Sequence, residues 1–287
     1  MLLTEHSKCI PKMNNRVSVV IVCYNRPKQA RRTVESLLEN GNAPFEVILV
    51  DDGSKSPIRI DFPFPNLRLI RFEKEVGLSN ARNYGLKEAR GDYIAFIDDD
   101  TVVSENWLEE VEKGINAGAD IIGGPLKPLF NSKPPEWWSE EHFGALAGVG
   151  NAQAQEIWGA NMVFRREVFE KVGFFNPELG RKNGKLFTYE DRDLIVRAEE
   201  SSFKPLFVNG AEVFHSVPSS RMTINYVLKW SYYFGKTEKI INGPEVLTSC
   251  YALLIAAMQT AYLLFRAKKP DMFKAISRIA VLLGRLS

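Results

Sequence analysis

Three consecutive carboxylates, Asp98, Asp99 and Asp100, are the residues of this sequence best suited to chemistry. Adjacent carboxylates repel one another, so a cation that joins them stabilises the folded chain. Asp98 and Asp100 project to one side of an extended chain and can share one ion, and oxygen ligands favour Mg²⁺ or Mn²⁺ completed by substrate phosphates. The alternative is a solvated turn in which an Asp caps a helix predicted near Ser104–Gly114. The triplet alone does not decide between a metal site and a polar turn.

Each polar cluster of the N-terminal half follows an apolar run typical of a strand that is buried on both faces. The runs precede Asn25, the Asp51-Asp52 pair and the aspartate triplet, and they are Val17–Cys23, Phe45–Val50 and Tyr93–Ile97. In an open α/β sheet, ligands bind outside the carboxyl ends of the strands. We therefore expect the three clusters to meet at one edge of a sheet.

Helical patterns separate these strands. With helices predicted at Pro27–Gly41 and Ser79–Ala89 and a further strand at Leu67–Phe72, the order is strand–helix–strand–strand–helix–strand. This order predicts an α/β fold with a doubly wound, mixed but mainly parallel sheet and helices on both faces. Further along we predict a strand at Ile121–Gly124, a loop-rich Pro125–Ala147, helices at Arg166–Val172 and Asp191–Ser201, and a strand at Leu206–Val208.

Composition sets few limits. The 287 residues suffice for one large α/β domain or two small ones. Lys and Arg total 37 against 35 Asp and Glu, so net charge argues neither way about nucleic acid, and we expect no nucleic-acid partner. The three separated cysteines form no disulfide framework, which fits a reducing cytoplasm. The polar N-terminus does not resemble a signal peptide.

The C-terminal region differs from the rest. Residues 246–265 carry no charge and are followed by Arg266, Lys268 and Lys269, a length and flank that suit a membrane-spanning helix on its cytoplasmic side. Four polar residues dilute this segment, so a helix buried on the domain or lying at an interface stays an alternative. The segment Met272–Leu286 is amphipathic and basic, as in helices that lie on anionic membranes. We expect residues 221–287 to be helical and to associate with the cytoplasmic face of a membrane.

Four segments together resemble the family 2 glycosyltransferases, which have the GT-A fold. They are VSVVIVCYNRP (Val17–Pro27), EVILVDDGS (Glu46–Ser54), EVGLSNARNYGL (Glu75–Leu86) and GDYIAFIDDDT (Gly91–Thr101). Each segment is weakly specific, but their order and spacing also agree with the family. The resemblance implies a catalytic domain over residues 15–220, with a nucleotide-sugar half at 15–103 and an acceptor half at 104–220.

On the donor side, the resemblance implies a role for each matching residue. It places Val22, Tyr24 and Asn25 in the base and ribose pocket, Asp51 or Asp52 against the nucleoside, and Asn80 and Arg82 at the border of that pocket. Asp98 is expected near the ribose and sugar, and Asp100 on the metal between the phosphates, while Asp99 contacts the donor or only orients the loop. Two alternatives stay open: Asp51-Asp52-Gly53-Ser54 as a plain turn, and Arg82 as a surface ion-pair residue.

On the acceptor side, WGANMVFRREVF (Trp158–Phe169) and YEDRDLIVRAEE (Tyr189–Glu200) also resemble the family. The resemblance places the catalytic base at Asp191, with Glu190 as a second candidate. Transfer with inversion needs a carboxylate that takes the proton of the attacking hydroxyl, opposite the leaving diphosphate whose charge a metal offsets. The alternative is an acidic helix N-terminus favoured by the helix dipole. Asp193 and Arg197 suit a helix-surface pair.

His215 follows a short predicted strand and matches a His that the family uses to ligate the metal or touch the diphosphate, although a lone His is often structural. Arg221 is a weaker candidate for a phosphate contact. Trp137, Trp138 and Trp158 suit stacking on a sugar or a lipid, or packing in the core or a lid.

These features predict an inverting glycosyltransferase that uses a UDP-, GDP- or dTDP-linked sugar and Mn²⁺ or Mg²⁺. Its expected acceptor is a hydroxyl of a surface glycan, a cell-wall polymer or a lipid-linked saccharide. A nucleotidyltransferase of related fold is one alternative, but it would carry a Gly-rich basic loop where this chain has Tyr24–Pro27. A non-catalytic glycan- or nucleotide-binding protein is another, although it would need neither Asp191 nor the metal carboxylates.

Overall fold

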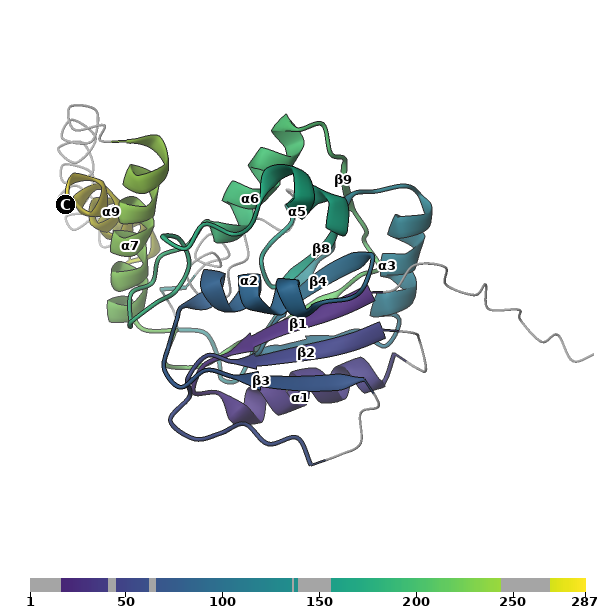
Figure 1. Ribbon diagram of the computed structural model, residues 1–287. Helices are drawn as coiled ribbons and strands as arrows, with labels where there is room; N and C mark the ends of the chain where they lie inside the picture. Colours follow the sequence, from purple (N-terminus) through teal and green to yellow (C-terminus); the bar gives the residue numbers. More distant parts are fainter. Residues whose placement is uncertain (1–16, 41–44, 62–65, 136, 139–155, 244–268) are drawn as a thin grey trace, which may run out of the picture.

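The computed structural model describes residues 17–40, 45–61, 66–135, 137–138, 156–243 and 269–287. A seven-stranded sheet in the order β3-β2-β1-β4-β8-β6-β9 forms its centre (Figure 1). Its strands are β1 (Val17–Cys23), β2 (Phe45–Asp51), β3 (Leu67–Arg71), β4 (Tyr93–Asp98), β6 (Ile121–Gly123), β8 (Asn161–Arg165) and β9 (Pro205–Phe207). The first four run parallel, β8 is antiparallel to β4 and β6, and β9 is parallel to β6. The predicted mixed, mainly parallel sheet is confirmed.

Helices cover both faces of this sheet, as predicted. The face that includes Val19 and Ile21 of β1 packs against α1 (Pro27–Leu38) and α3 (Trp107–Asn116). The face that includes Val20 packs against α2 (Leu78–Glu88), α5 (Arg166–Val172) and α6 (Glu190–Glu200). Because alternate residues of a strand point to opposite faces, a strand buried on both faces reads as one apolar run.

A second, three-stranded sheet was not predicted. Its order is β5-β10-β7, with β5 (Thr101–Val103), β7 (Leu126–Phe130) and β10 (Val213–Val217). Strand β7 corrects the prediction that Pro125–Ala147 is loop-rich from its start. His215 lies within β10, paired with Thr101 and Pro128, and not after a strand as predicted. Pairing with distant segments creates these short strands, so the local sequence pattern does not reveal them.

The helix predicted near Ser104–Gly114 begins later, at Trp107. The Trp107 N–H donates to the Ser104 carbonyl, so residues 104–107 form a turn that brings the chain from β5 into α3. The Trp107 indole is fully buried and donates to Asn161 Oδ1 at 3.0 Å. The indole therefore fixes the start of the helix against β8.

Helices α7 (Ile224–Asn242) and α9 (Lys269–Leu286) pack together at one side of the molecule (Figure 1). Gly235 faces the Val281 carbonyl and Gly284 faces the Tyr232 carbonyl, too close for any side chain to fit between the two backbones. Among the described residues, no helix is long and apolar enough to cross a bilayer. The span considered at residues 246–265 lies outside the described residues.

Candidate active site

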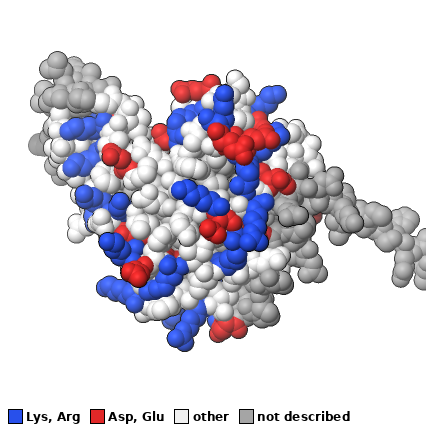
Figure 2. Space-filling model, viewed as in Figure 1, with Lys and Arg blue, Asp and Glu red and all other residues white. Residues whose placement is uncertain are grey.

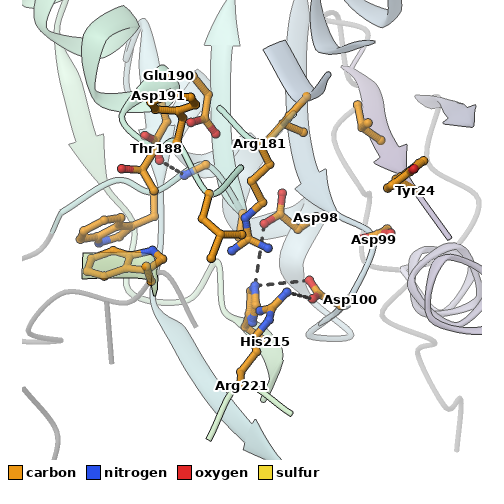
Figure 3. Close-up of a pocket in the computed structure, with 18 of the residues that line it drawn as sticks. Tyr24, Asp98, Asp99, Asp100, Arg181, Thr188, Glu190, Asp191, His215 and Arg221 are labelled. Carbon is orange, nitrogen blue, oxygen red and sulfur yellow. Dashed lines mark hydrogen bonds and ion pairs between the residues drawn. The ribbon is translucent and has the colours of Figure 1, made fainter. Parts of the chain in front are cut away.

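A cavity of about 900 Å³ opens at the carboxyl ends of β1 and β4. Here β1 lies between β2 and β4, so chain connections leave it in opposite directions and a crevice forms where they part. The register pairs Asp98 with Val22 on the neighbouring strand, and both residues line the cavity. In Figure 3, Asp98 and Asp100 lie on one side with His215 and Arg221, while Glu190 and Asp191 lie across from them.

Cations surround the aspartate triplet. The Arg26 guanidinium pairs with Asp99 at 2.7 Å and also with Asp100 Oδ2, which accepts a second hydrogen bond from Arg221 Nη2 at 2.9 Å. Asp99 and Asp100 are both buried. Two buried carboxylates beside each other are tolerated because these guanidinium groups supply opposite charge at contact distance.

Asp98, Asp100 and His215 form a group that fits a divalent cation. One ligand atom from each lies within 4.8 Å of the others. His215 Nε2 is 3.3 Å from Asp100 Oδ1 and 3.8 Å from Asp98 Oδ2, while Nδ1 lies 3.2 Å from the Ser216 carbonyl. Because Nδ1 faces that carbonyl, Nε2 is the ring nitrogen that points toward the two carboxylates, an arrangement usual for metal-binding histidines. Asp100 Oδ1 is buried and accepts no hydrogen bond from the described residues, so this oxygen is available to a cation.

The three aspartates have different proton affinities. Burial acts to raise the pKa of Asp98, but adjacent His215 and Arg82 outweigh it and hold that pKa well below its usual range. Burial opposes ionisation of Asp100 as well, yet His215, Arg26 and Arg221 lower its pKa to about 2. Burial, reinforced by the neighbouring carboxylates, raises the pKa of Asp99 to about 7. The two candidate ligands are therefore the two that stay ionised.

Arg82 connects the two sides of the cavity. Its side chain, on α2, is only 3% exposed. Nη2 donates to Asp98 Oδ1 at 2.9 Å and to the Gly159 carbonyl at 3.1 Å, and Nη1 donates to Glu190 Oε1 at 2.9 Å. The surface ion-pair alternative for Arg82 is therefore wrong, because its guanidinium is buried. Its proposed contact with the donor stays a prediction.

Glu190 and Asp191 begin α6, and the backbone fixes the second of them. Asp191 Oδ2 accepts the Gly159 N–H at 2.6 Å, and Oδ1 accepts the N–H of Arg192 at 2.8 Å. Tyr189, just before α6, has a left-handed backbone with φ 71°. Non-glycine residues in this conformation are uncommon and concentrate at functional sites. Burial and the adjacent Asp191 carboxylate raise the pKa of Glu190 to about 7, against the opposing charge of Arg82.

The nucleoside-side residues divide into two groups. Val22, Tyr24, Asp52 and Arg82 line the cavity. The Asp52 carboxylate accepts the N–H groups of Val76 and Gly77 at 2.7 and 3.0 Å, so it also holds the loop before α2.

The other group does not belong to the described lining. Asp51 pairs with Arg71 and accepts the Ser54 N–H, Asn25 accepts the Lys55 N–H, and Asn80 donates to the Val76 carbonyl. These contacts support the turns around the pocket, and direct donor contacts of the three residues stay predictions.

Sequence reasoning missed four arginines that line the cavity, Arg26, Arg32, Arg181 and Arg192. A signal existed for Arg26, because it follows β1 and the aspartates follow β4, and these strands are neighbours. The sequence around Arg181 holds no comparable signal. Trp137 and Trp138 pack against the core, with the Phe130 and Trp138 ring centroids 5.3 Å apart, whereas Trp158 lines the cavity.

Comparison with known proteins agrees with this geometry. A family model described as glycosyl transferase family 2 matches residues 18–173. The glucosyl-dolichyl phosphate glucuronosyltransferase of Haloferax volcanii is 26% identical over 242 residues, which are 79% of this chain and 77% of that protein. Glycosyltransferase GlyG of Streptococcus pneumoniae is 33% identical over 76% of this chain and 77% of its own.

A solved structure shares the fold. The mannosyltransferase of Pyrobaculum calidifontis, in complex with GDP-Man and Mn²⁺, aligns with a TM-score of 0.62 at 16% identity, over 95% of this chain and 88% of that one. The resemblance of the four N-terminal segments, the GT-A-like fold and the match of the family model agree with one another. The chain belongs to glycosyl transferase family 2 and is a glycosyltransferase.

Proposed function

We propose that this glycosyltransferase moves a sugar from a nucleoside-diphosphate donor to a hydroxyl acceptor with inversion at the anomeric carbon. One observation carries the proposal: the Asp98–Asp100–His215 group and Asp191 face each other across one cavity. An in-line displacement needs this opposition, because the nucleophile attacks from the side opposite the leaving group. Family membership favours this reaction over nucleotidyl transfer and over a non-catalytic binding role.

On the donor side, we propose that Asp98, Asp100 and His215 hold Mn²⁺ or Mg²⁺. The bound ion would offset the charge of the leaving diphosphate. Val22, Tyr24 and Asp52 line the same cavity, and we propose that they receive the nucleoside. Arg26 and Arg221 supply further positive charge beside Asp100 and can contact phosphate oxygens. The donor in the P. calidifontis complex, GDP-Man, has the same chemistry as the donor proposed for this chain.

On the acceptor side, we propose that Asp191 takes the proton of the attacking hydroxyl. The N–H groups of Gly159 and Arg192 orient its carboxylate. Glu190 is buried and bound to Arg82, so its proposed task is to hold that guanidinium and the start of α6. We propose that the acceptor hydroxyl belongs to a saccharide of a surface glycan, of a cell-wall polymer or of a lipid-linked sugar.

A donor screen with Mn²⁺, in which release of nucleoside diphosphate is measured, tests the proposal. Asp100→Ala should lose both turnover and metal-dependent donor binding, whereas Asp191→Asn should lose turnover about 10²–10⁴-fold and still bind the donor. Asp193→Asn is the matched control, because Asp193 pairs with Arg197 on α6. Wild-type turnover by Asp191→Asn would show that the base assignment is wrong.

We further propose that the chain works at the cytoplasmic face of a membrane, through α7 and α9. Figure 2 shows basic side chains gathered over this side of the molecule. Lys229 and Arg278 are exposed there, and so are Ile240, Ile241 and Leu283. Basic and apolar side chains together suit an anionic lipid surface.

A sedimentation assay tests this proposal. The full chain should sediment more with vesicles that contain phosphatidylglycerol than with vesicles of pure phosphatidylcholine. The double variant Lys229→Gln/Arg278→Gln should show a smaller difference between the two kinds of vesicle. If wild type and the double variant sedimented equally with the phosphatidylglycerol vesicles, the proposed membrane contact would be wrong.

A further inference from the structure

Helix α7 contributes side chains to the cavity, although it lies outside the segments that resemble the family. Tyr226, Trp230 and Phe234 all line the cavity, and they follow one another at intervals of four residues. Residues at this spacing share one face of a helix. One face of α7 is therefore a wall of the cavity, even though the predicted domain boundary at residue 220 would place this helix outside the catalytic domain.

This wall is aromatic. The Trp230 and Phe234 ring centroids are 5.0 Å apart, and Phe234 lies 5.2 Å from the Tyr189 ring. Trp158 lines the same cavity, and all four rings are only partly buried. Partly exposed aromatic rings in a concave site are typical of ligand-binding surfaces, because a bound ligand completes their burial.

The aromatic side chains lie next to the proposed base along two chain segments. Tyr189 comes directly before Glu190 and Asp191. Trp158 comes directly before Gly159, whose N–H binds the Asp191 carboxylate at 2.6 Å. A ligand that covers these rings would therefore lie beside Asp191. Tyr24, where the nucleoside is expected, lies on the other side of the site (Figure 3).

Specific contacts fix α7 to the segment that leads into the base. The Thr188 N–H donates to Thr237 Oγ1 at 3.2 Å, and Thr237 Oγ1 donates to the Tyr233 carbonyl at 3.0 Å. The Phe187 and Tyr233 ring centroids are 5.2 Å apart. Because Thr237 is fully buried, this junction is part of the packed structure and not a surface contact.

We infer that Trp158, Trp230 and Phe234 form an aromatic platform that binds a sugar ring of the acceptor beside Asp191. The inference rests on the proposed function, and it deepens that function by naming the side chains that bind the acceptor sugar. A pyranose has a face of C–H groups that packs on aromatic rings, while its hydroxyl groups point outward around the edge. A ring seated on this platform can present one such hydroxyl to the Asp191 carboxylate. A simple alcohol or a bare lipid phosphate has no such face.

Acceptor kinetics test the platform. The probes are p-nitrophenyl β-D-glucoside, β-D-galactoside, α-D-mannoside and N-acetyl-β-D-glucosaminide, each added to the full chain with Mn²⁺ and the donor found in the screen. We expect at least one probe to accelerate nucleoside diphosphate release and to saturate. Trp230→Ala should raise the KM for that probe about 10-fold, while the Kd for the donor changes less than twofold.

Two further variants separate stacking from folding. Trp230→Phe keeps an aromatic face and should recover most of the loss in KM. Tyr232→Ala changes an α7 ring outside the described cavity lining and should leave KM unchanged. Phe234→Leu keeps an apolar volume but no ring, and should raise KM if stacking is the cause.

Three results would overturn the inference. An unchanged KM in Trp230→Ala would show that the ring does not bind the acceptor. An equal rise in the donor Kd would place a nucleobase on the platform. Acceleration by farnesyl phosphate and by none of the glycosides would make the acceptor a lipid. If wild type releases no nucleoside diphosphate from any donor, with or without a probe, the proposed function itself is wrong and the inference with it.

Discussion

The two acidic clusters of the cavity have opposite surroundings. Asp98–Asp100 lies among Arg26, Arg82, Arg221 and His215, and the pKa of Asp100 is lowered to about 2. Glu190 and Asp191 lie beside Arg82, backbone N–H groups and aromatic rings, and the pKa of Glu190 is raised to about 7. The neighbouring positive charge keeps Asp98 and Asp100 ionised, so these carboxylates can hold a cation, while the arginines themselves suit phosphates. In the second cluster, Arg82 holds Glu190, and backbone N–H groups hold the Asp191 carboxylate.

Arg82 is the residue that both clusters share. Its guanidinium is almost fully buried and donates to Asp98, to Glu190 and to the Gly159 carbonyl. The N–H of the same Gly159 binds the Asp191 carboxylate. The two sides of the cavity are thus bound to a single side chain on α2. If this connection matters, a change at Arg82 must affect both sides together, whereas changes elsewhere should affect one side only.

Removing this connection should have the largest effect on stability. Arg82→Met leaves Glu190 buried without its cation and Asp98 with His215 as its remaining close partner. Breaking a buried ion pair in this way costs about 3–5 kcal/mol. We therefore expect a loss of that size in the free energy of unfolding, measured by urea denaturation with Mn²⁺ absent.

The matched control is Arg165→Met. Arg165 is 44% exposed and pairs with Asp120 and Glu167 at the surface. Exposed pairs contribute about 0–1 kcal/mol, so this variant should unfold close to wild type. If both variants lost the same free energy of unfolding, the buried ion pairs of Arg82 would contribute no more to stability than an exposed pair.

Gly159→Ala should affect the acceptor side more than the donor side. A Cβ at this position would lie 2.9 Å from Asp191 Oδ2 and 3.2 Å from Arg82 Nη2, so the base must shift. A displacement of about 1 Å at a catalytic group can cost about 10²-fold in rate. We expect kcat to fall by that factor while the Kd for donor and Mn²⁺ changes by much less, as measured by steady-state kinetics and calorimetry.

Gly210→Ala is the control for this change. Its added Cβ would meet the side chain of Glu110, whose flexible end can move away. Wild-type kcat is expected. If Gly159→Ala raised the donor Kd as much as it lowered kcat, this position would affect the donor side and the acceptor side equally.

The sequence predicted the strands of the central sheet better than those of the second sheet, for a physical reason. Strands buried on both faces, such as Tyr93–Asp98, appear as continuous apolar runs, and the polar residues after them mark a sheet edge. The base segment and His215 were found through resemblance. Strand β10 was missed because its five residues pair with segments far away in the chain.

Packing between distant segments was not predictable. Arg82 lies in a helix, and its burial results from a contact with Glu190, 108 residues further along the chain. The aromatic face of α7 appears in the sequence as residues at a four-residue spacing, a pattern equally typical of a core helix. Only the tertiary structure shows that this face borders a cavity.

A pH titration of stability distinguishes the clusters by sign. The folded-state pKa of Glu190 is about 7, above the value of about 4.3 expected when unfolded. From about pH 5 to 7 the folded chain keeps a proton that the unfolded chain has lost, so the contribution of Glu190 to stability decreases as pH rises. Relative to Glu190→Gln, wild type should lose on the order of 2 kcal/mol over this range, measured by urea denaturation at each pH.

Exposed Glu167 supplies the control, since Glu167→Gln should leave the pH profile unchanged. For the donor-side carboxylates, the contribution to stability should change with pH in the opposite direction. Because the pKa of Asp100 is lowered to about 2, its contribution is present above about pH 4 and is lost as pH falls toward 2. A wild-type profile parallel to that of Glu190→Gln between pH 5 and 7 would contradict the contrast between the two clusters.

The smallest effect is expected behind the aromatic wall, at the pair between α9 and α7. Arg285 donates to both carboxylate oxygens of Glu238 at 2.8 and 2.6 Å, and it is 32% exposed. A partly exposed pair of this kind contributes about 0.5–1 kcal/mol, so Arg285→Met should lower the urea midpoint only slightly.

The donor-side contacts do not involve α9, so the Kd for donor and Mn²⁺ should be the same in Arg285→Met as in wild type. Lys113→Met removes an exposed pair on α3 and gives the baseline for losing a surface cation. Because α7 lines the acceptor wall, any kinetic change in Arg285→Met should appear in the KM for the glycoside probe. A change in the donor Kd instead would show that α7 and α9 support the donor side as well, which would contradict their assignment to the acceptor side.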